Sequence, residues 1–172
     1  MIVRILVLSA LAVLVAAGRS DAQDRGGFTA LVDLGLGVQS DSAIEETAVG
    51  LGGLGFGVGA FLNPNLAVMF RLTGTSVTYD LGEDYGQSSG VGGGAVQYWL
   101  SDKLNVEAGA GLGYWRGDND DSSRGLGLIL GAGMSVWNRG KHNLQAGAHY
   151  LPAFTDPGTV HNFLFTLGYQ FQ

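Results

Sequence analysis

Four ionisable side chains stand alone in otherwise apolar, glycine-rich stretches of this sequence. They are Asp33, Arg71, Glu107 and His149. Each lies near the middle of a segment in which apolar residues take every second position, and each falls on the other phase. Arg71 is a permanent cation and His149 can be neutral or charged, so the set can form a neutralised cluster. We expect Arg71 to pair with Glu107 or Asp33 inside the fold, where an unpaired charge would be costly.

Two further patterns resemble ligand motifs but lack the necessary context. Gly50, Gly52 and Gly55 spell G-x-G-x-x-G, which binds dinucleotides when a helix follows it, and no helical pattern follows here. "DNDD" at 118–121 offers hard oxygen ligands, but it has neither the glycine nor the distal glutamate of a calcium loop. We interpret 118–121 as a solvated acidic loop. No cofactor, metal site or nucleic-acid partner is predicted.

The elements that must position the four ionisable residues are strands. The closing segment "HNFLFTLGYQFQ" places Phe163, Phe165, Leu167, Tyr169 and Phe171 on every second position, which is the period of a strand with one apolar face. The same alternation recurs along the chain and predicts eight strands, each of a length suited to a tilted membrane strand. They lie near 27–39, 50–62, 66–79, 91–101, 104–115, 125–137, 142–154 and 161–171.

The connections between these strands alternate in length and chemistry. Tight turns are expected at 63–65, 102–103 and 138–141, whereas 40–49, 80–90 and 116–124 are long, polar and acidic, with a shorter fourth member at 155–160. Alternating long and short connections are typical of an antiparallel up-and-down barrel. An even number of strands then places both termini on the side of the short turns.

The two faces of the strands decide between a soluble barrel and a membrane barrel. One face is apolar, and the other carries glycine with about one charge per strand or fewer. A secreted soluble binding barrel would turn the second face to water, where roughly a quarter to a third of residues should be charged. We therefore predict that the apolar face meets lipid and that the glycine face lines a narrow lumen, closed so that every backbone group is paired.

Large side chains support this arrangement. Phe61, Trp99 and Ile129 fall on the inward phase with the charges, so the lumen of a barrel of this size should be filled. Aromatic residues gather near both rims, as in the girdles of membrane barrels. The short-turn rim is assigned Tyr98, Trp99, Trp137, Tyr169 and Phe171, and the long-loop rim Tyr79, Tyr114, Trp115, Tyr150 and Phe154.

The first 22 residues have the three regions of a secretory signal. Arg4 precedes an apolar run from Ile5 to about Ala17, and Ser20 and Ala22 stand at positions −3 and −1 of a predicted cleavage before Gln23. The run is shorter than the ~20 residues a permanent membrane helix needs. The chain has no cysteine, which rules out a lipoprotein anchor and disulfides. We assign 1–22 to a signal peptide and 23–172 to one barrel domain.

In pattern, length and closing segment, residues 26–172 resemble the small eight-stranded outer-membrane barrels of Gram-negative bacteria, OmpA/OmpX-like. The resemblance implies an all-β transmembrane barrel with periplasmic termini and extracellular long loops. It also implies contact with outer-membrane lipid and lipopolysaccharide. "FLFTLGYQF" resembles the C-terminal signal read by the outer-membrane insertion machinery, carried here by Phe163, Phe165, Leu167, Tyr169 and Phe171. The family usually ends on an aromatic residue, whereas Gln172 follows Phe171 here.

Some barrels of this type modify lipids, so an enzymatic role must be considered. The deacylase type has a His-x-Ser element on a late strand, and Leu151 stands at the serine position after His149. His161 is likewise followed by Asn162 and Phe163, with no hydroxyl. Acyl transfer needs a nucleophile beside its base. The sequence therefore predicts a non-enzymatic barrel for envelope integrity or surface interaction through its acidic loops. The alternatives are a narrow low-conductance pore, a lipid-modifying enzyme and a secreted soluble binding barrel, and the oligomeric state is left open.

Overall fold

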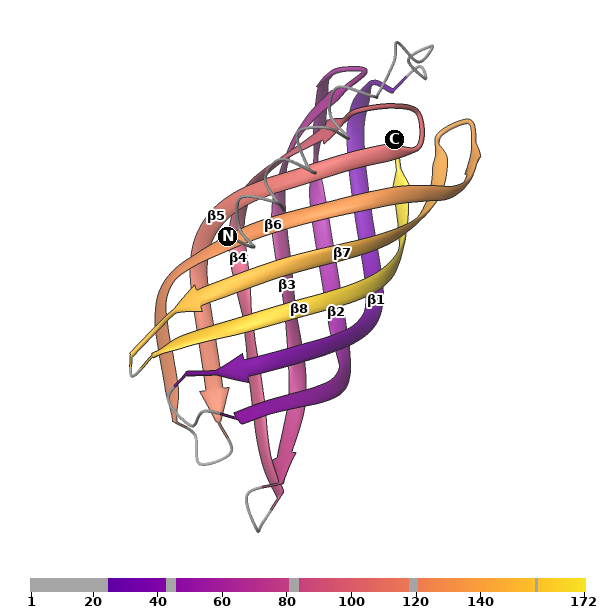
Figure 1. The fold of residues 1–172 in the computed structure, drawn as a ribbon. Coiled ribbons are helices and arrows are strands. Elements are labelled where there is room, and N and C mark those ends of the chain that lie inside the picture. Colours follow the sequence, from indigo (N-terminus) through magenta and orange to yellow (C-terminus); the bar gives the residue numbers. More distant parts are fainter. Residues whose placement is uncertain (1–24, 43–45, 81–83, 118–120, 157) are drawn as a thin grey trace, which may run out of the picture.

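The chain folds into one closed barrel of antiparallel strands (Figure 1). The computed structural model describes residues 25–42, 46–80, 84–117, 121–156 and 158–172. Each strand pairs with its neighbour in sequence, and the first closes the barrel against the last. The strands are β1 (Gly27–Asp41), β2 (Glu46–Asn63), β3 (Leu66–Asp80), β4 (Asp84–Trp99), β5 (Leu104–Gly117), β6 (Ser122–Arg139), β7 (His142–Phe154) and β8 (Thr159–Phe171).

Strand register brings both ends of the barrel domain to the rim of the short turns. The closing ladder between β1 and β8 runs from Ala30 opposite Phe171 to Asp41 opposite Val160. Because all backbone groups in such a ladder pair across strands, closure leaves no open sheet edge. This confirms the predicted eight-stranded antiparallel up-and-down barrel. The predicted signal peptide, residues 1–22, lies outside the described residues.

The predicted strand boundaries are wrong at the rim of the long loops. Segments 40–49, 80–90 and 116–124 were expected to be loops, but β1 continues to Asp41, β4 begins at Asp84 and β6 begins at Ser122. Polar residues at a rim still pair their backbones, and Thr, Tyr and Ser fit a strand without an apolar neighbour. The sequence pattern located the apolar band of each strand and missed its polar extension. At the other rim β4 ends at Trp99 rather than near residue 101.

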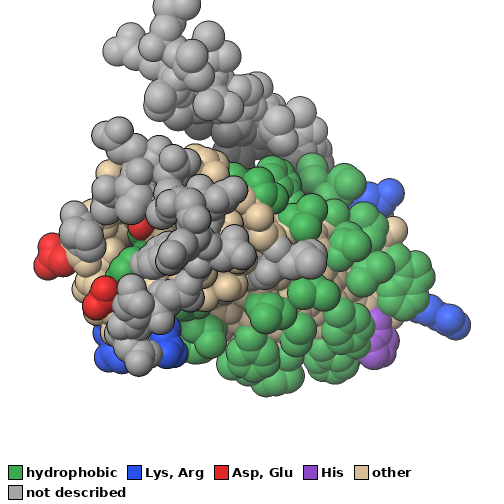
Figure 2. Space-filling view, turned by 90° about the horizontal axis from the view of Figure 1, so that it is seen from below, with side chains coloured by type: hydrophobic (Ala, Val, Ile, Leu, Met, Phe, Trp, Pro, Cys, Tyr) green, Lys and Arg blue, Asp and Glu red, His purple; other side chains and the backbone are tan. Residues whose placement is uncertain are grey.

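The outward face is apolar and the interior is not. Leu34, Leu54 and Leu112 are each at least 60% exposed, as are Phe165 and Leu167 near the chain end. Figure 2 shows such hydrophobic side chains gathered into a broad continuous surface, with charged side chains toward its ends. Buried positions instead include many polar residues, among them Asp33, Arg71, Glu107, Gln97 and Gln170. This distribution is inverted relative to a soluble barrel and excludes that alternative.

The girdle assignment is wrong for Trp115 and for Trp99, whereas the inward phase predicted for Trp99 is confirmed. Trp99 is 2% exposed and packs inside the barrel, and Trp115 is half-buried on the same phase as the buried Gly113 and Gly117. Their positions near a rim are correct, but strand alternation points them inward. Outward aromatic residues remain at both rims, with Tyr98, Trp137 and Tyr169 at one and Tyr114, Tyr150 and Phe154 at the other. The side chain of Tyr79 lies outside the described residues.

Every described element is a strand, so no helix follows Gly50, Gly52 and Gly55, which belong to β2. In the described parts of the chain, no helix is long and apolar enough to cross a membrane. The same residues contain no cluster of His, Cys, Asp or Glu that could hold a metal ion. Residues 118–120 of the predicted acidic loop at 118–121 lie outside the residues that the structure describes.

Candidate functional site

An arginine bound to two acids occupies the middle of the lumen. The Arg71 Nε donates to Glu107 Oε1 at 2.9 Å, and Nη2 donates to Asp33 Oδ2 at 3.0 Å. The side chain of Arg71 is fully buried, and both carboxylates are 2% exposed. The sequence predicted a pair with one acid, whereas the structure gives a bridge between β1, β3 and β5. Charge-assisted hydrogen bonds of this kind are about twice as strong as neutral ones.

His149 lies beside this bridge and interacts electrostatically with Glu107, Arg71 and Asp33. Its Nδ1 is buried and has no hydrogen-bond partner in the described part of the barrel. Arg71 Nη1 and Asp33 Oδ1 are likewise buried without a partner there. The structure therefore brings the four predicted residues into one region, but His149 is a neighbour of the ion-pair bridge and takes no part in its hydrogen bonds.

Glycines make room for each charged side chain on the adjacent strands. Asp33 stands opposite Gly55 and Gly168, and Arg71 stands opposite Gly57 and Gly93. A Cβ at Gly57 would lie 2.8 Å from the Arg71 Cδ, and one at Gly55 would overlap the Asp33 carboxylate. Large polar side chains therefore fit a narrow lumen because their cross-strand partners have no side chain.

The same relation holds for the other two members of the site. Gly131 of β6 stands opposite Glu107 of β5 on one side and opposite His149 of β7 on the other. A Cβ at Gly131 would lie 3.0 Å from the His149 Nε2 and closer still to the ring carbon Cδ2. The sequence carries a signal of this arrangement, because a glycine on the inward phase stands opposite each inward charge on at least one neighbouring strand. Hydrophobic periodicity alone does not detect it.

An apolar plug closes the lumen toward the short turns. It is a buried cluster of Phe61, Ala67, Met69, Ala95 and Trp99. Arg25 lies across its end, with its guanidinium carbon 3.9 Å from the centre of the Trp99 ring and its Nε donating to Gln172 Oε1 at 3.1 Å. Cation–π contact and hydrogen bonds together fix this side chain at the mouth of the barrel.

A set of buried amides lies beside the plug, with Gln97 between the plug residues Ala95 and Trp99 on β4. Gln170 Nε2 donates to Gln97 Oε1 at 2.8 Å and to Thr29 Oγ1 at 3.1 Å. Gln97 Nε2 donates to Asn105 Oδ1 at 3.2 Å, and Asn105 Nδ2 donates to Gln145 Oε1 at 3.0 Å. The chain of amides crosses the lumen from β8 through β4 and β5 to β7, so the cross-section here is spanned by bonded side chains.

Two more layers separate the ion-pair bridge from the long loops. First comes a cluster of Val91, Ile129, Leu151 and Leu164, each 0% exposed. Beyond it the Ser89 hydroxyl donates its one proton to Asn162 Oδ1 at 2.7 Å, with Gln39 Oε1 3.3 Å from the same oxygen, while Gln87 Nε2 donates to Asp41 Oδ2 at 2.7 Å. β4 contributes to several of these groups, with Trp99 and Ala95 in the plug, Val91 in the apolar cluster and Ser89 and Gln87 in the polar one. The lumen is thus filled by alternating apolar and polar side chains.

Among the residues that the structure describes, none forms an acyl-transfer site with His149. Leu151, at the position where a deacylase type would have serine, is fully buried in the apolar layer. His161 stands on the outward phase, where its Nδ1 shares a hydrogen bond of 2.7 Å with the Tyr150 hydroxyl. In a catalytic triad, one histidine nitrogen bonds to a serine and the other to a carboxylate. Neither His149 nor His161 has these two partners among the hydrogen bonds of the described residues.

Comparison with known proteins settles the family. The outer membrane protein beta-barrel domain matches residues 6–171. The chain belongs to this family. Among solved structures, Neisserial surface protein A is 20% identical with a TM-score of 0.65, over 84% of this chain and 96% of that one. Ail, the attachment invasion locus protein of Yersinia pestis, is 12% identical with a TM-score of 0.59, over 84% and 99%. No curated protein matches the chain.

Membership of the outer-membrane barrels assigns the surroundings of each face. The exposed leucines, valines and phenylalanines of the wall face the hydrocarbon of the outer membrane of a Gram-negative bacterium, and outward aromatic residues lie toward both rims. On β8, Phe163, Phe165, Leu167 and Tyr169 all face this lipid. Their role, with Phe171, as an assembly signal stays a prediction.

Proposed function

We propose that this outer-membrane barrel is a non-enzymatic, non-conducting scaffold that presents its acidic loops at the cell surface and contributes to envelope integrity. The filled lumen carries the proposal. Buried apolar and polar side chains occupy it, including the Arg71 bridge with hydrogen bonds of 2.9 and 3.0 Å, so the surfaces left for partners are the loops and the outer wall. Contact with lipopolysaccharide and assembly by the outer-membrane insertion machinery follow from the same placement.

The charge of the two rims supports an orientation with the long loops outside. Lys103, Arg139 and Lys141 lie in or beside the short turns, whereas the connections at the other rim are rich in Asp and Glu. The termini would then be periplasmic. One structure of Ail holds the heparin analogue sucrose octasulfate. An acidic rim would repel such a polyanion, so a cationic or neutral surface partner suits this chain better.

Complementation of a deletion strain tests this role. Deletion should increase sensitivity to detergents and hydrophobic dyes, and the wild-type gene should restore resistance. A variant in which the rim acids Asp84 and Asp121 become Asn, checked by heat-modifiable migration on a gel, should weaken surface binding while keeping the barrel. Unchanged detergent sensitivity together with a loss of small-solute uptake in the deletion strain would contradict the proposal and favour the narrow pore instead.

A further inference from the structure

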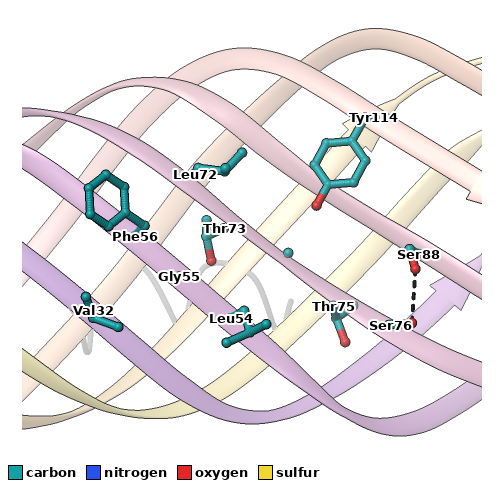
Figure 3. A pocket seen from close by; sticks show the side chains of 11 residues that line it. Val32, Leu54, Gly55, Phe56, Leu72, Thr73, Thr75, Ser76, Ser88 and Tyr114 are labelled. Atoms are coloured by element: carbon teal, nitrogen blue, oxygen red, sulfur yellow. Dashed lines mark hydrogen bonds between the residues drawn. The ribbon is translucent and has the colours of Figure 1, made fainter.

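The outer wall carries a groove that the proposed scaffold role does not use. It has a volume of about 500 Å³ and crosses β1 to β4 on the lipid-facing side, with Tyr114 of β5 at one edge (Figure 3). Pockets for drug-sized ligands are roughly 300–1,000 Å³, so the groove is large enough for a ligand. Its outward walls are Val32, Leu54, Phe56 and Leu72.

Gly74 lines the groove and is one of a pair of glycines that face each other across the wall. Gly74 of β3 stands directly opposite Gly90 of β4, and Leu54 of β2 stands opposite Gly74 on the other side. Both glycines fall on the outward phase, so the wall has no side chains at this point. The Tyr114 hydroxyl reaches over them, because a Cβ at Gly90 would lie 2.7 Å from that oxygen. Tyr114 therefore lies along the wall and forms an edge of the groove.

One end of the groove is polar. The Ser88 hydroxyl donates to the Ser76 hydroxyl at 3.0 Å, as the dashed line in Figure 3 marks, and both side chains line the groove. The Tyr114 hydroxyl points toward the groove in the same view and has no hydrogen bond within the described residues. A buried or half-buried phenol normally finds a partner. This donor is therefore free to bind a group that enters the groove from the membrane.

The polar end lies at the level of the lipid carbonyls. Ser76 is five residues along β3 from Arg71, which occupies the middle of the apolar band that starts at Leu66. Strands rise ~3.4 Å per residue and tilt ~40° in such barrels, so Ser76 is about 13 Å from the middle of a band ~25 Å tall. The apolar part of the groove thus spans the hydrocarbon of one leaflet, and its hydroxyls lie at the boundary with the headgroups.

We propose that this groove binds one acyl chain of a lipid from the leaflet at the long-loop rim, with the lipid carbonyl accepting a hydrogen bond from the Tyr114 hydroxyl. The apolar walls exclude water, so an empty groove would forfeit contacts that an acyl chain restores. Naming this leaflet the outer one rests on the orientation proposed above. The site itself is independent of that orientation and of the role in envelope integrity.

Retention of lipid on the folded barrel tests the site. The protein is refolded into vesicles of palmitoyl-oleoyl-phosphatidylcholine, extracted in a mild detergent and weighed by native mass spectrometry. The wild type should retain one lipid, and Leu54→Trp, which fills the groove, should lose it. Leu126→Trp is the matched control, because Leu126 is 57% exposed against 63% for Leu54 and lies on β6 away from the groove. Heat-modifiable migration on a gel establishes that each variant has folded.

The hydroxyl is tested by a smaller change. Tyr114→Phe should weaken lipid retention about two- to tenfold, which is the equivalent of one net hydrogen bond. Tyr98→Phe, at an exposed tyrosine of the opposite rim, should leave retention unchanged. Equal retention by the wild type and Leu54→Trp would overturn the site and indicate ordinary boundary lipid only. Equal effects of Tyr114→Phe and Tyr98→Phe would overturn the assigned hydrogen bond. Neither result depends on the surface assays of the proposed function.

Discussion

Replacing Arg71 by Met should destabilise the barrel more than any single change of its acidic partners. The substitution keeps a long side chain but removes two charge-assisted hydrogen bonds, of 2.9 and 3.0 Å, and leaves the carboxylates of Asp33 and Glu107 buried without a counter-charge. Removing one partner of a buried ion pair costs about 3–5 kcal/mol. Glu107→Gln alone should cost less, about 1.5–3 kcal/mol, because Arg71 still holds Asp33.

The double variant distinguishes a pairing from two independent effects. If the two sites were independent, Arg71→Met with Glu107→Gln would cost the sum of the single changes. We instead expect the double variant to be more stable than Arg71→Met alone, because the second change removes one of the stranded charges. Adding Asp33→Asn should recover still more, since replacing a whole buried ion cluster by neutral groups is often nearly neutral.

Equilibrium unfolding in urea from lipid vesicles, followed by tryptophan fluorescence, measures these free energies. Trp99 lies in the plug of the same lumen and reports on its packing. The stabilising bridge is refuted if Arg71→Met unfolds at the wild-type urea concentration, or if Glu107→Gln adds its full cost to that of Arg71→Met. Leu112→Met, on the exposed outer wall, is the control for a change to methionine outside the lumen.

Three further predictions concern the close contacts of glycines, the Arg25 side chain over the plug and the orientation of the two rims. Gly93→Ala should destabilise the barrel by about 1–3 kcal/mol, because its Cβ would overlap the backbone of Ala110. Gly94→Ala has open space around it and should be neutral or stabilising by up to about 1 kcal/mol. Urea unfolding measures both. Arg25→Ala should lower the urea midpoint and increase solvent quenching of Trp99, since the guanidinium covers that ring. Protease added to intact cells should cut at the connections of the long-loop rim and spare the turn between β6 and β7, and cleavage at that turn in sealed cells would reverse the proposed orientation.

The sequence predicts the architecture well because each strand carries its own two-residue period. Leu34 and Asp33 are neighbours that face opposite sides, and alternation alone separates lipid from lumen. The inward position of Arg71 between two acids follows from the same alternation, but its choice of both acids depends on register between β1, β3 and β5. Register is set by pairing across strands, and no local pattern reports it.

Other features depend on space between strands that are distant in sequence. The groove in the outer wall includes Gly74, which meets Gly90 across a ladder, and Tyr114 from a third strand extends over both glycines. The sequence does not reveal the ends of the strands at the long-loop rim, because many residues there are polar on both faces. The hydrophobic periodicity therefore ends before the backbone hydrogen-bond ladder does. The height of Trp99 along its strand alone suggests a girdle position, whereas alternation correctly places its side chain inside the lumen.

Electrical recording from the barrel in a planar lipid bilayer tests the filled lumen most directly. The side chains buried inside it include the apolar cluster of Val91, Ile129, Leu151 and Leu164 and the plug around Trp99. The wild-type protein, shown to be folded by its heat-modifiable migration, should therefore give no stable conductance steps at moderate voltage. Regular single-channel steps from that folded protein would contradict a filled lumen and identify an open path past the Arg71 bridge.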